Sequence, residues 1–159
     1  DLTQHQNHSK QNMEYMDPHT NEKYIPYVVE PSVGVERLML AFMCEAYEVE
    51  ALDKGSRTVM KFDPKVAPIK AAVLPLSKKL SEKSIEIWEK LNEEFETDYD
   101  ESGSIGKRYR RQDEVGTPYC LTVDFDTLED NQITIRFRDT MDQKRVTVEE
   151  AIEIIKNSL

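Results

Sequence analysis

Residues 103–126, GSIGKRYRRQDEVGTPYCLTVDFD, contain a helix, a strand and the joint between them. Ser104 is placed to act as the N-cap, because a serine side chain can accept a free backbone N–H of the first helical turn. The expected inward stripe of this helix is Ile105, Tyr109, Gln112 and Val115. Gly116 stands where helices often end in a left-handed residue, and Pro118 prevents continuation. Residues 119–126 alternate between apolar and polar side chains, which predicts a half-buried strand.

The same helix carries the densest basic cluster of an otherwise acidic chain. Its members are Lys107, Arg108, Arg110 and Arg111. The formal net charge of the chain is −10, which argues against nonspecific coating of nucleic acid. Screening limits the field of the surrounding carboxylates to about 8 Å at physiological salt, so a local basic patch can still bind a partner at one defined place. We therefore expect a binding surface at this helix.

The residues that follow predict a hairpin and a terminal helix. Residues 133–138 alternate between apolar and polar side chains, so they predict an antiparallel partner for the preceding strand, across a turn at residues 128–131. Residues 144–148 predict a last short strand. Thr147 and Glu150 then match a capping box. The inner stripe of the helix that follows is Val148, Ala151, Ile152 and Ile155.

The residues before the basic helix predict two more strands and one more helix. Residues 66–76, VAPIKAAVLPL, form a nearly continuous apolar run, which suits a central strand covered on both faces. Residues 81–95 predict a helix, and residues 97–100 a short strand. The helix is expected to turn Ile85, Trp88, Leu91 and Phe95 inward. The order β-α-β-α-β-β-β-α predicts an α/β domain in which three helices pack on a mixed five-stranded sheet.

The amino-terminal part predicts a separate piece. Residues 24–30, YIPYVVE, read as a strand, and residues 38–49 as a helix that is apolar nearly all round and should be largely buried. Residues 51–64 are a mixed polar connection, so the boundary between a domain of residues 1–60 and one of residues 61–159 is placed there. Residues 1–23 are polar, with two short strand pieces and a turn at residues 17–21.

The sequence gives little support for a metal-binding site. His5 and His8 invite a metal interpretation, but a zinc site normally needs four suitable ligands, so solvated histidines are the preferred alternative and no metal site is expected. Cys44 and Cys120 are isolated and suit a reducing cytosol. No apolar run is long enough for a membrane span, and the polar amino end lacks a signal sequence, so we expect a cytoplasmic protein without membrane contact.

Residues 30–37, EPSVGVER, form a corner between the expected strand and helix. A strand that ends in a carboxylate, then a small-residue turn and a helix that opens with an arginine, is a common arrangement for an anionic ligand. Gly34 lets a backbone approach closely, and the amino end of a helix favours negative charge. The alternative is a capped turn with an ordinary ion pair between Arg37 and either Glu30 or Glu36.

Two separated segments resemble the same family. The run GSIGKRYRRQDEVGTPYCLTVDFDTLED resembles the anticodon-binding domain of the glycyl, threonyl, prolyl and histidyl class II aminoacyl-tRNA synthetases, and VAPIKAAVLPL resembles its first strand. EPSVGVERLMLAF is similar to motif 3 of the dimeric glycyl-tRNA synthetases, and DLTQHQNHSKQNMEYMD with YIPYVVE resembles the region just before it. The resemblance covers essentially the whole chain. Residues 1–60 would then be a strand-helix fragment of the class II catalytic domain, and residues 61–159 the anticodon-binding domain.

This resemblance implies a glycine–tRNA ligase. Such an enzyme uses ATP and Mg²⁺ to activate glycine, and transfers the glycyl group to tRNA(Gly); the full-length enzymes are homodimers. The chain begins at Asp1 rather than Met, and nothing in it resembles motifs 1 and 2. We therefore expect the carboxy-terminal part of the enzyme, unable to form glycyl-adenylate alone. We expect no DNA partner.

The resemblance also implies roles for individual residues. Glu30 would receive the glycine ammonium and Ser32 would lie beside it. Gly34 would leave room for the nucleotide, and Arg37 would contact ATP. The glycine-binding set is Glu30, Pro31, Ser32, Val33 and Gly34, and the ATP-binding set is Gly34, Val35, Glu36 and Arg37. No catalytic residue is assigned to this chain.

Anticodon contacts are implied for the basic helix. Lys107, Arg108, Arg110 and Arg111 would contact backbone and bases. Tyr109 could stack on a base, although it also lies on the inward stripe. Asp113 and Glu114 could instead neutralise two of the arginines. For Arg136 and Arg138, cross-strand ion pairs on the polar face of the hairpin are as good an explanation as RNA contact.

Two other functions fit parts of the sequence. A noncatalytic, synthetase-like accessory module would bind tRNA or protein on the same fold, but it would have no need for the intact set of Glu30, Ser32, Gly34 and Arg37. A generic α/β domain without an RNA partner would suit the acidic charge and would leave the EPSVGVER corner unexplained.

Overall fold

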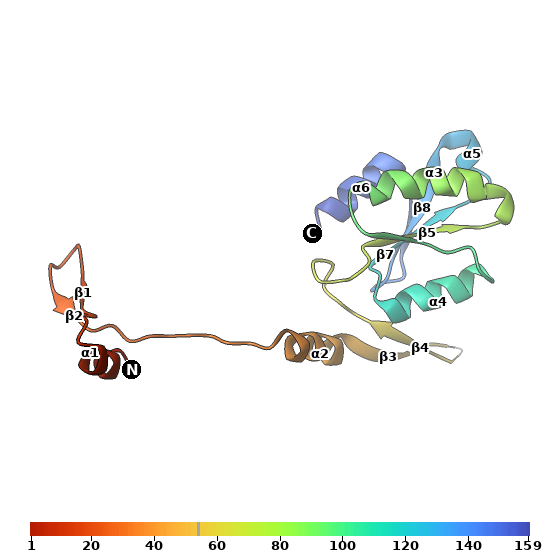
Figure 1. The fold of residues 1–159 in the computed structure, drawn as a ribbon. Helices are drawn as coiled ribbons and strands as arrows, with labels where there is room; N and C mark the ends of the chain where they lie inside the picture. Colours follow the sequence, from red (N-terminus) through yellow and green to blue (C-terminus); the bar gives the residue numbers. More distant parts are fainter. Residues whose placement is uncertain (54) are drawn as a thin grey trace. The chain divides into compact units, whose positions relative to one another are not determined.

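The computed structural model describes residues 1–53 and 55–159, which divide into two compact units, Asp1–Leu38 and Met39–Leu159 (Figure 1). No helix of the described residues is long and apolar enough to cross a membrane.

The first unit contains one short helix and a two-stranded hairpin. Helix α1 (Leu2–Ser9) has no buried residue. The sequence did not predict it, because its polar residues form no apolar stripe. Strands β1 (Tyr15–Met16) and β2 (Lys23–Tyr24) pair antiparallel. The turn at residues 17–21 is confirmed, since the Asp17 carbonyl accepts the Asn21 N–H at 2.9 Å. The strand expected over residues 24–30 is wrong beyond Tyr24, because Pro26 has no N–H to donate and residues 25–34 have no regular structure.

Helix α2 (Val35–Ala46) is exposed rather than buried, which corrects the expectation for residues 38–49. Of its residues only Ala46 is buried, and its large apolar side chains, such as Leu38, Met39 and Leu40, remain exposed. The helix also ends earlier than expected. The chain passes directly into β3 (Tyr47–Ala51), where Val49 lies in a strand.

Strand β4 (Ser56–Met60) replaces the polar connection expected over residues 51–64. It pairs antiparallel with β3, from Tyr47 opposite Met60 to Ala51 opposite Ser56. Gly55 has a φ of 89°, a conformation that glycine adopts freely and that suits a hairpin turn. The division of the parent protein into domains of residues 1–60 and 61–159 stays a prediction.

The main sheet has five strands, as the sequence predicts, and their order in the sheet is β6-β5-β7-β8-β9. They are β5 (Ala71–Pro75), β6 (Thr97–Tyr99), β7 (Tyr119–Val123), β8 (Gln132–Phe137) and β9 (Gln143–Thr147). Strand β5 runs parallel to β6 and β7, whereas the pairs β7–β8 and β8–β9 are antiparallel. The mixed α/β class is therefore confirmed.

Helices cover both faces of this sheet (Figure 1). Helices α3 (Ser81–Asn92) and α6 (Val148–Lys156) lie on one face, over the larger apolar core, and α4 (Ile105–Val115) lies on the other. A one-turn helix α5 (Thr127–Asp130) forms the turn before β8, and a short 3-10 helix η1 (Lys78–Leu80) precedes α3. The capping box of Thr147 and Glu150 is confirmed at the start of α6.

Three burial predictions need correction. Strand β7 is buried on both faces rather than one, because α4 covers the face that the alternating pattern assigned to solvent. On α3 the buried isoleucine is Ile87 at 3% exposure, whereas Ile85 is 41% exposed, because the stripe that meets the sheet runs through Ser84, Ile87 and Leu91. Val115, at the last turn of α4, is 40% exposed.

Candidate functional site

The residues expected to bind glycine lie before helix α2, and those expected to bind ATP lie at its start. Glu30, Pro31, Ser32 and Val33 belong to the irregular segment 25–34, and their side chains are exposed. Gly34 begins the helix by accepting the Leu38 N–H on its carbonyl at 3.0 Å. A Cβ at Gly34 would meet only the Arg37 Cγ, at 4.0 Å. The described chain therefore presents this corner as an open surface, so these roles stay predictions.

The residues that the structure describes offer neither a metal-binding cluster nor, at Cys120, a reactive thiol. Among the residues that the structure describes, no group of three His, Cys, Asp or Glu side chains could hold a metal ion. Cys120 lies on β7 at 1% exposure, and burial raises the pKa of its thiol to about 12. This thiol is therefore protonated at neutral pH and is not a nucleophile.

The four basic side chains of α4 divide into an outer and an inner set. Lys107 is exposed, and Arg110 and Arg111 are partly exposed, so these three face solvent within one helical turn. Arg108 is different, at 5% exposure. The spacing could have shown this, because Arg108 lies three residues after Ile105 and four before Gln112, on the inward stripe.

Arg108 is fully engaged by backbone carbonyls. Its guanidinium donates to the Gly103 carbonyl at 3.0 Å, to the Asp100 carbonyl at 3.4 Å, and to the carbonyl of Pro75 at the end of β5. These bonds tie the start of α4 to the sheet. The geometry favours a structural role over a contact with RNA, contrary to the expectation for this residue.

Arg110 and Arg111 keep part of their charge available. Arg111 donates to Asp100 Oδ2 through Nε at 2.9 Å, and 43% of its side chain is still exposed. Arg110 lies 3.9 Å from Asp113 Oδ2, the outer limit of an ion pair. Partly exposed pairs of this kind are weak and are readily exchanged for another anion.

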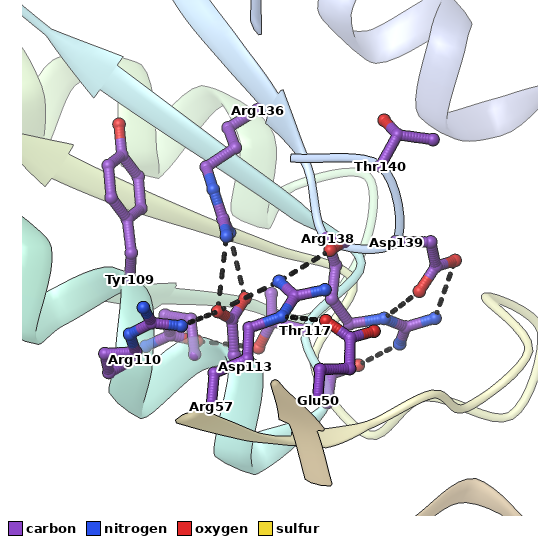
Figure 2. Close-up of polar contacts among 12 residues, drawn as sticks. Glu50, Arg57, Tyr109, Arg110, Asp113, Thr117, Arg136, Arg138, Asp139 and Thr140 are labelled. Atoms are coloured by element: carbon purple, nitrogen blue, oxygen red, sulfur yellow. Dashed lines mark hydrogen bonds and ion pairs between the residues drawn. The ribbon is translucent and has the colours of Figure 1, made fainter. Parts of the chain in front are cut away.

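Beneath this surface lies a buried network centred on Asp113, which is fully buried (Figure 2). Its carboxylate accepts two hydrogen bonds from Arg136 on β8, at 2.9 and 3.2 Å, and one from Arg57 on β4 at 3.3 Å. Both arginines are themselves at least nine-tenths buried. The sequence offered no signal for Arg57, which stood in an expected loop.

Tyr109 and Arg138 also belong to the interior. The Arg136 guanidinium lies 4.8 Å from the centre of the Tyr109 ring, and the Tyr109 hydroxyl is 2.6 Å from Thr122 Oγ1. Burial raises the pKa of the Tyr109 phenol. Arg138 is 2% exposed and donates to the carbonyls of Gly116 and Phe62 at 2.8 and 2.7 Å. Tyr109 is therefore on the inward stripe, which favours the structural interpretation over stacking on a base.

The expected cross-strand pairs are also replaced. The counter-ion of Arg136 is Asp113 on helix α4, which packs on this face of the sheet, and not a residue of the neighbouring strand. Asp124, the residue just after β7, pairs with Arg145 on β9 at 2.7 Å. This pair lowers the pKa of the Asp124 carboxyl.

The contribution of Glu50 to the stability of the fold depends on pH. The hydrogen bond from Arg57, followed by that from Lys61, lowers the pKa of its carboxyl from 4.5 to about 2. Because the folded-state pKa is the lower one, the ionised carboxylate stabilises the fold above the unfolded-state value, and this stabilisation is lost as pH falls from about 4.5 to about 2. We expect the free energy of unfolding of wild type and of Glu50→Gln to converge over that interval in urea titrations. A difference that stays constant down to about pH 2.5 would contradict the assignment.

Residues 70–158 match the family described as Anticodon binding domain. The chain belongs to this family. The matched residues of this anticodon-binding domain contain all five strands of the main sheet, with α3, α4 and α6. The resemblance read from the basic helix and from residues 66–76 is therefore confirmed.

Curated relatives extend the similarity beyond the anticodon-binding domain. A Glycine--tRNA ligase of Clostridium beijerinckii is 60% identical over 160 residues, which is 100% of this chain and 35% of that protein. A Glycine--tRNA ligase of Staphylococcus haemolyticus is 60% identical over 94% of this chain and 33% of its own length. The chain thus spans about a third of the curated relatives that it matches.

Solved structures agree on the fold of the anticodon-binding domain. The RNA binding domain of threonyl-tRNA synthetase from Cryptosporidium parvum superposes with a TM-score of 0.54 at 26% identity, over 57% of this chain and 24% of that one. A histidyl-tRNA synthetase from Nostoc has the same TM-score, 0.54, at 17% identity over 57% of this chain and 22% of its own; at that identity the likeness concerns the fold alone.

Proposed function

We propose that this chain supplies the motif 3 segment and the anticodon-recognition domain of a glycine–tRNA ligase. The observation that supports this most strongly is the 60% identity to such a ligase across 100% of the chain, including residues 1–69, which lie outside the anticodon-binding family match. Identity across both segments is what a shared enzyme predicts, since an isolated RNA-binding module would need only the second.

In this proposal the corner before α2 takes part in the activation of glycine. Glu30 would bind the substrate ammonium by charge-assisted hydrogen bonds, and Arg37 would bind phosphate oxygens of ATP with its rigid guanidinium. An exposed carboxylate gains little from such a pair in water, because the dielectric constant is high. The corner therefore needs further protein walls, and the isolated chain is expected to form no glycyl-adenylate. Mg²⁺, the homodimer and the cytoplasmic location belong to the same proposal.

The outer surface of α4 is the proposed place of anticodon contact. Lys107, Arg110 and Arg111 supply positive charge that solvent reaches, whereas Arg108 holds the helix on the sheet from below. Side chains of this kind neutralise phosphates, and the planar guanidinium groups of the two arginines can also lie flat on unstacked bases. Their ion pairs with Asp100 and Asp113 are weak enough to be exchanged for contacts with RNA.

Charge reversal on α4 tests this assignment. We expect the double variant Lys107→Glu, Arg110→Glu to weaken binding of glycine tRNA to the chain by roughly tenfold or more, and to reduce the slope of log K against log salt by about two. Fluorescence titrations at several salt concentrations measure both quantities.

The matched control places the same charge change on α3. The variant Lys83→Glu, Lys90→Glu alters the net charge equally, on the opposite face of the sheet from α4 (Figure 1). Equal weakening by the two double variants would mean that binding follows net charge and not α4. Equal binding of glycine and noncognate tRNAs by the wild-type chain would remove the proposed recognition role.

A further inference from the structure

The β3–β4 hairpin packs on the anticodon-binding domain through a buried face. Along β4 the side chains alternate, and the inward ones, Arg57 and Val59, are 1% and 0% exposed. Strand β4 packs against α4, as Figure 1 also shows. On the partner strand, Glu50 lies opposite Arg57 and shares its face. A hairpin that served only as a flexible linker would have no reason to bury a guanidinium.

Arg57 joins three separate parts of the fold with one side chain (Figure 2). Its guanidinium donates to Glu50 on β3, to Asp113 on α4, and to the backbone carbonyl of Arg138 at 2.9 Å, just after β8. Among the described residues its Nη2 is buried without a hydrogen-bond partner. Buried ion pairs with imperfect hydrogen bonding add little stability over an apolar residue of similar size. Their advantage is orientation, because a planar fork accepts partners only in fixed directions.

A second arginine, Arg138 of the anticodon-binding domain, also contacts the hairpin segment. The Arg138 side chain donates to the carbonyl of Phe62, just after β4, and to that of Gly116, at the end of α4. At Gly116 the two pieces approach so closely that a Cβ would lie 2.5 Å from a ring carbon of Phe62 and 2.9 Å from the Met60 carbonyl oxygen. The hairpin is thus held by Arg57 on β4 and by Arg138, which reaches the residue Phe62 just after β4 from the other side of the interface.

From this geometry we propose that the hairpin is a rigid positioning element and that Arg57 locks it to the anticodon-binding domain. Helix α2 passes into β3 without an intervening residue. A locked hairpin therefore holds the carboxy-terminal end of α2, from which β3 begins, in place. Arg57 would act as a positioning residue, because it touches none of the proposed substrates. Its effect on tRNA charging rests on the proposed function, whereas the locking itself does not.

The variant Arg57→Met tests the lock without stranding a charge. Asp113 keeps Arg136, and Glu50 keeps Lys61 at 2.7 Å, so both carboxylates remain paired when Arg57 is removed. In hydrogen exchange on the 159-residue chain, we expect amides of β3 and β4 to exchange at least about tenfold faster, while those of β5 and β7 keep their protection. Unchanged exchange in the hairpin would overturn the proposal, and so would an equal loss throughout the domain.

Arg145→Met is the matched control. It removes an arginine that also pairs with two carboxylates, Asp124 and Asp130, but that does not reach the hairpin. We expect it to leave exchange in β3 and β4 unchanged. If Arg145→Met loosens the hairpin as much as Arg57→Met does, Arg57 has no special role.

Kinetics in a glycine–tRNA ligase that contains this sequence test the consequence. We expect Arg57→Met to raise the KM for tRNA by about fivefold or more and to leave glycine-dependent pyrophosphate exchange, which uses no tRNA, unchanged. Arg57→Lys keeps the charge and should restore part of the loss. Equal falls in both reactions would indicate simple destabilisation and overturn the positioning role. If the wild-type ligase showed no glycine-dependent pyrophosphate exchange, the proposed function would be refuted. The hydrogen-exchange result on the hairpin would still stand.

Discussion

Replacement of Asp113 by Asn is expected to lower the free energy of unfolding by about 3–5 kcal/mol, the cost of leaving a buried charge without its partner. The carboxylate is fully buried and is the acceptor for Arg136 and Arg57, which are 5% and 1% exposed. The neutral amide keeps the size of the side chain, but it leaves the Arg136 guanidinium without a counter-ion. Urea unfolding of the chain, followed by circular dichroism, measures the change.

The control for Asp113 is Glu94→Gln, the same carboxylate-to-amide change at the surface. Glu94 pairs with Lys156 at 2.7 Å, and both side chains are more than 40% exposed. Exposed pairs of this kind contribute about 1 kcal/mol or less. Similar losses in the two variants would show that Asp113 is not the electrostatic centre of the fold. We also expect Asp113→Asn to weaken tRNA binding, because α4 would lose its attachment to β8.

Replacement of Gly116 by Ala is expected to cost about 3 kcal/mol, from a backbone penalty of about 1–2 kcal/mol and a further overpacking penalty of about 1–3 kcal/mol. The residue has a φ of +90°, and an added Cβ would lie 2.9 Å from the carbonyl oxygen of Met60 and 2.5 Å from the Phe62 ring. The ring can move, but the backbone of β4 cannot move without shifting the hairpin. Thermal and urea unfolding check the size of the loss.

Gly103 separates the two penalties. Its φ is +78°, but an added Cβ would meet only the flexible Lys107 Cδ, at 3.9 Å. Gly103→Ala should therefore cost the backbone penalty alone, about 1–2 kcal/mol. If both alanine variants lose the same amount, the close approach of the hairpin to Gly116 makes no energetic contribution.

Those parts of the fold that depend on interactions between residues close in sequence could be predicted. The start and the inward stripe of helix α6 follow from the sequence, because the capping box and the apolar spacing lie within nine residues, Val148–Lys156, and the N-cap before them. The strands of the main sheet were predicted for the same reason, since each is a short run with its own pattern. The hairpin β3–β4 was missed, because its polar outward residues masked the two buried ones, Arg57 and Val59.

The candidate site divides in the same way. The basic character of α4 is a local property, so Lys107, Arg110 and Arg111 could be proposed from the sequence. Helical spacing places Arg108 on the inward stripe, but its bond to the Pro75 carbonyl, 33 residues away, depends on the tertiary fold. The contact of Asp113 with Arg57, 56 residues away, depends on it in the same way. Charge alone does not tell a surface arginine from one that the fold surrounds.

The sequence by itself determined the order of helices and strands, the mixed five-stranded sheet and the resemblance to the anticodon-binding domain, because these follow from periodicity, capping and motifs that need no distant partner. Only the tertiary structure decided which charged residues lie inside. The packing of β4 and β8 against α4 excludes water from Arg57, Asp113 and Arg136, and a charge without water must be paired. Arg111, about one helical turn after Arg108, keeps 43% of its side chain exposed to solvent instead.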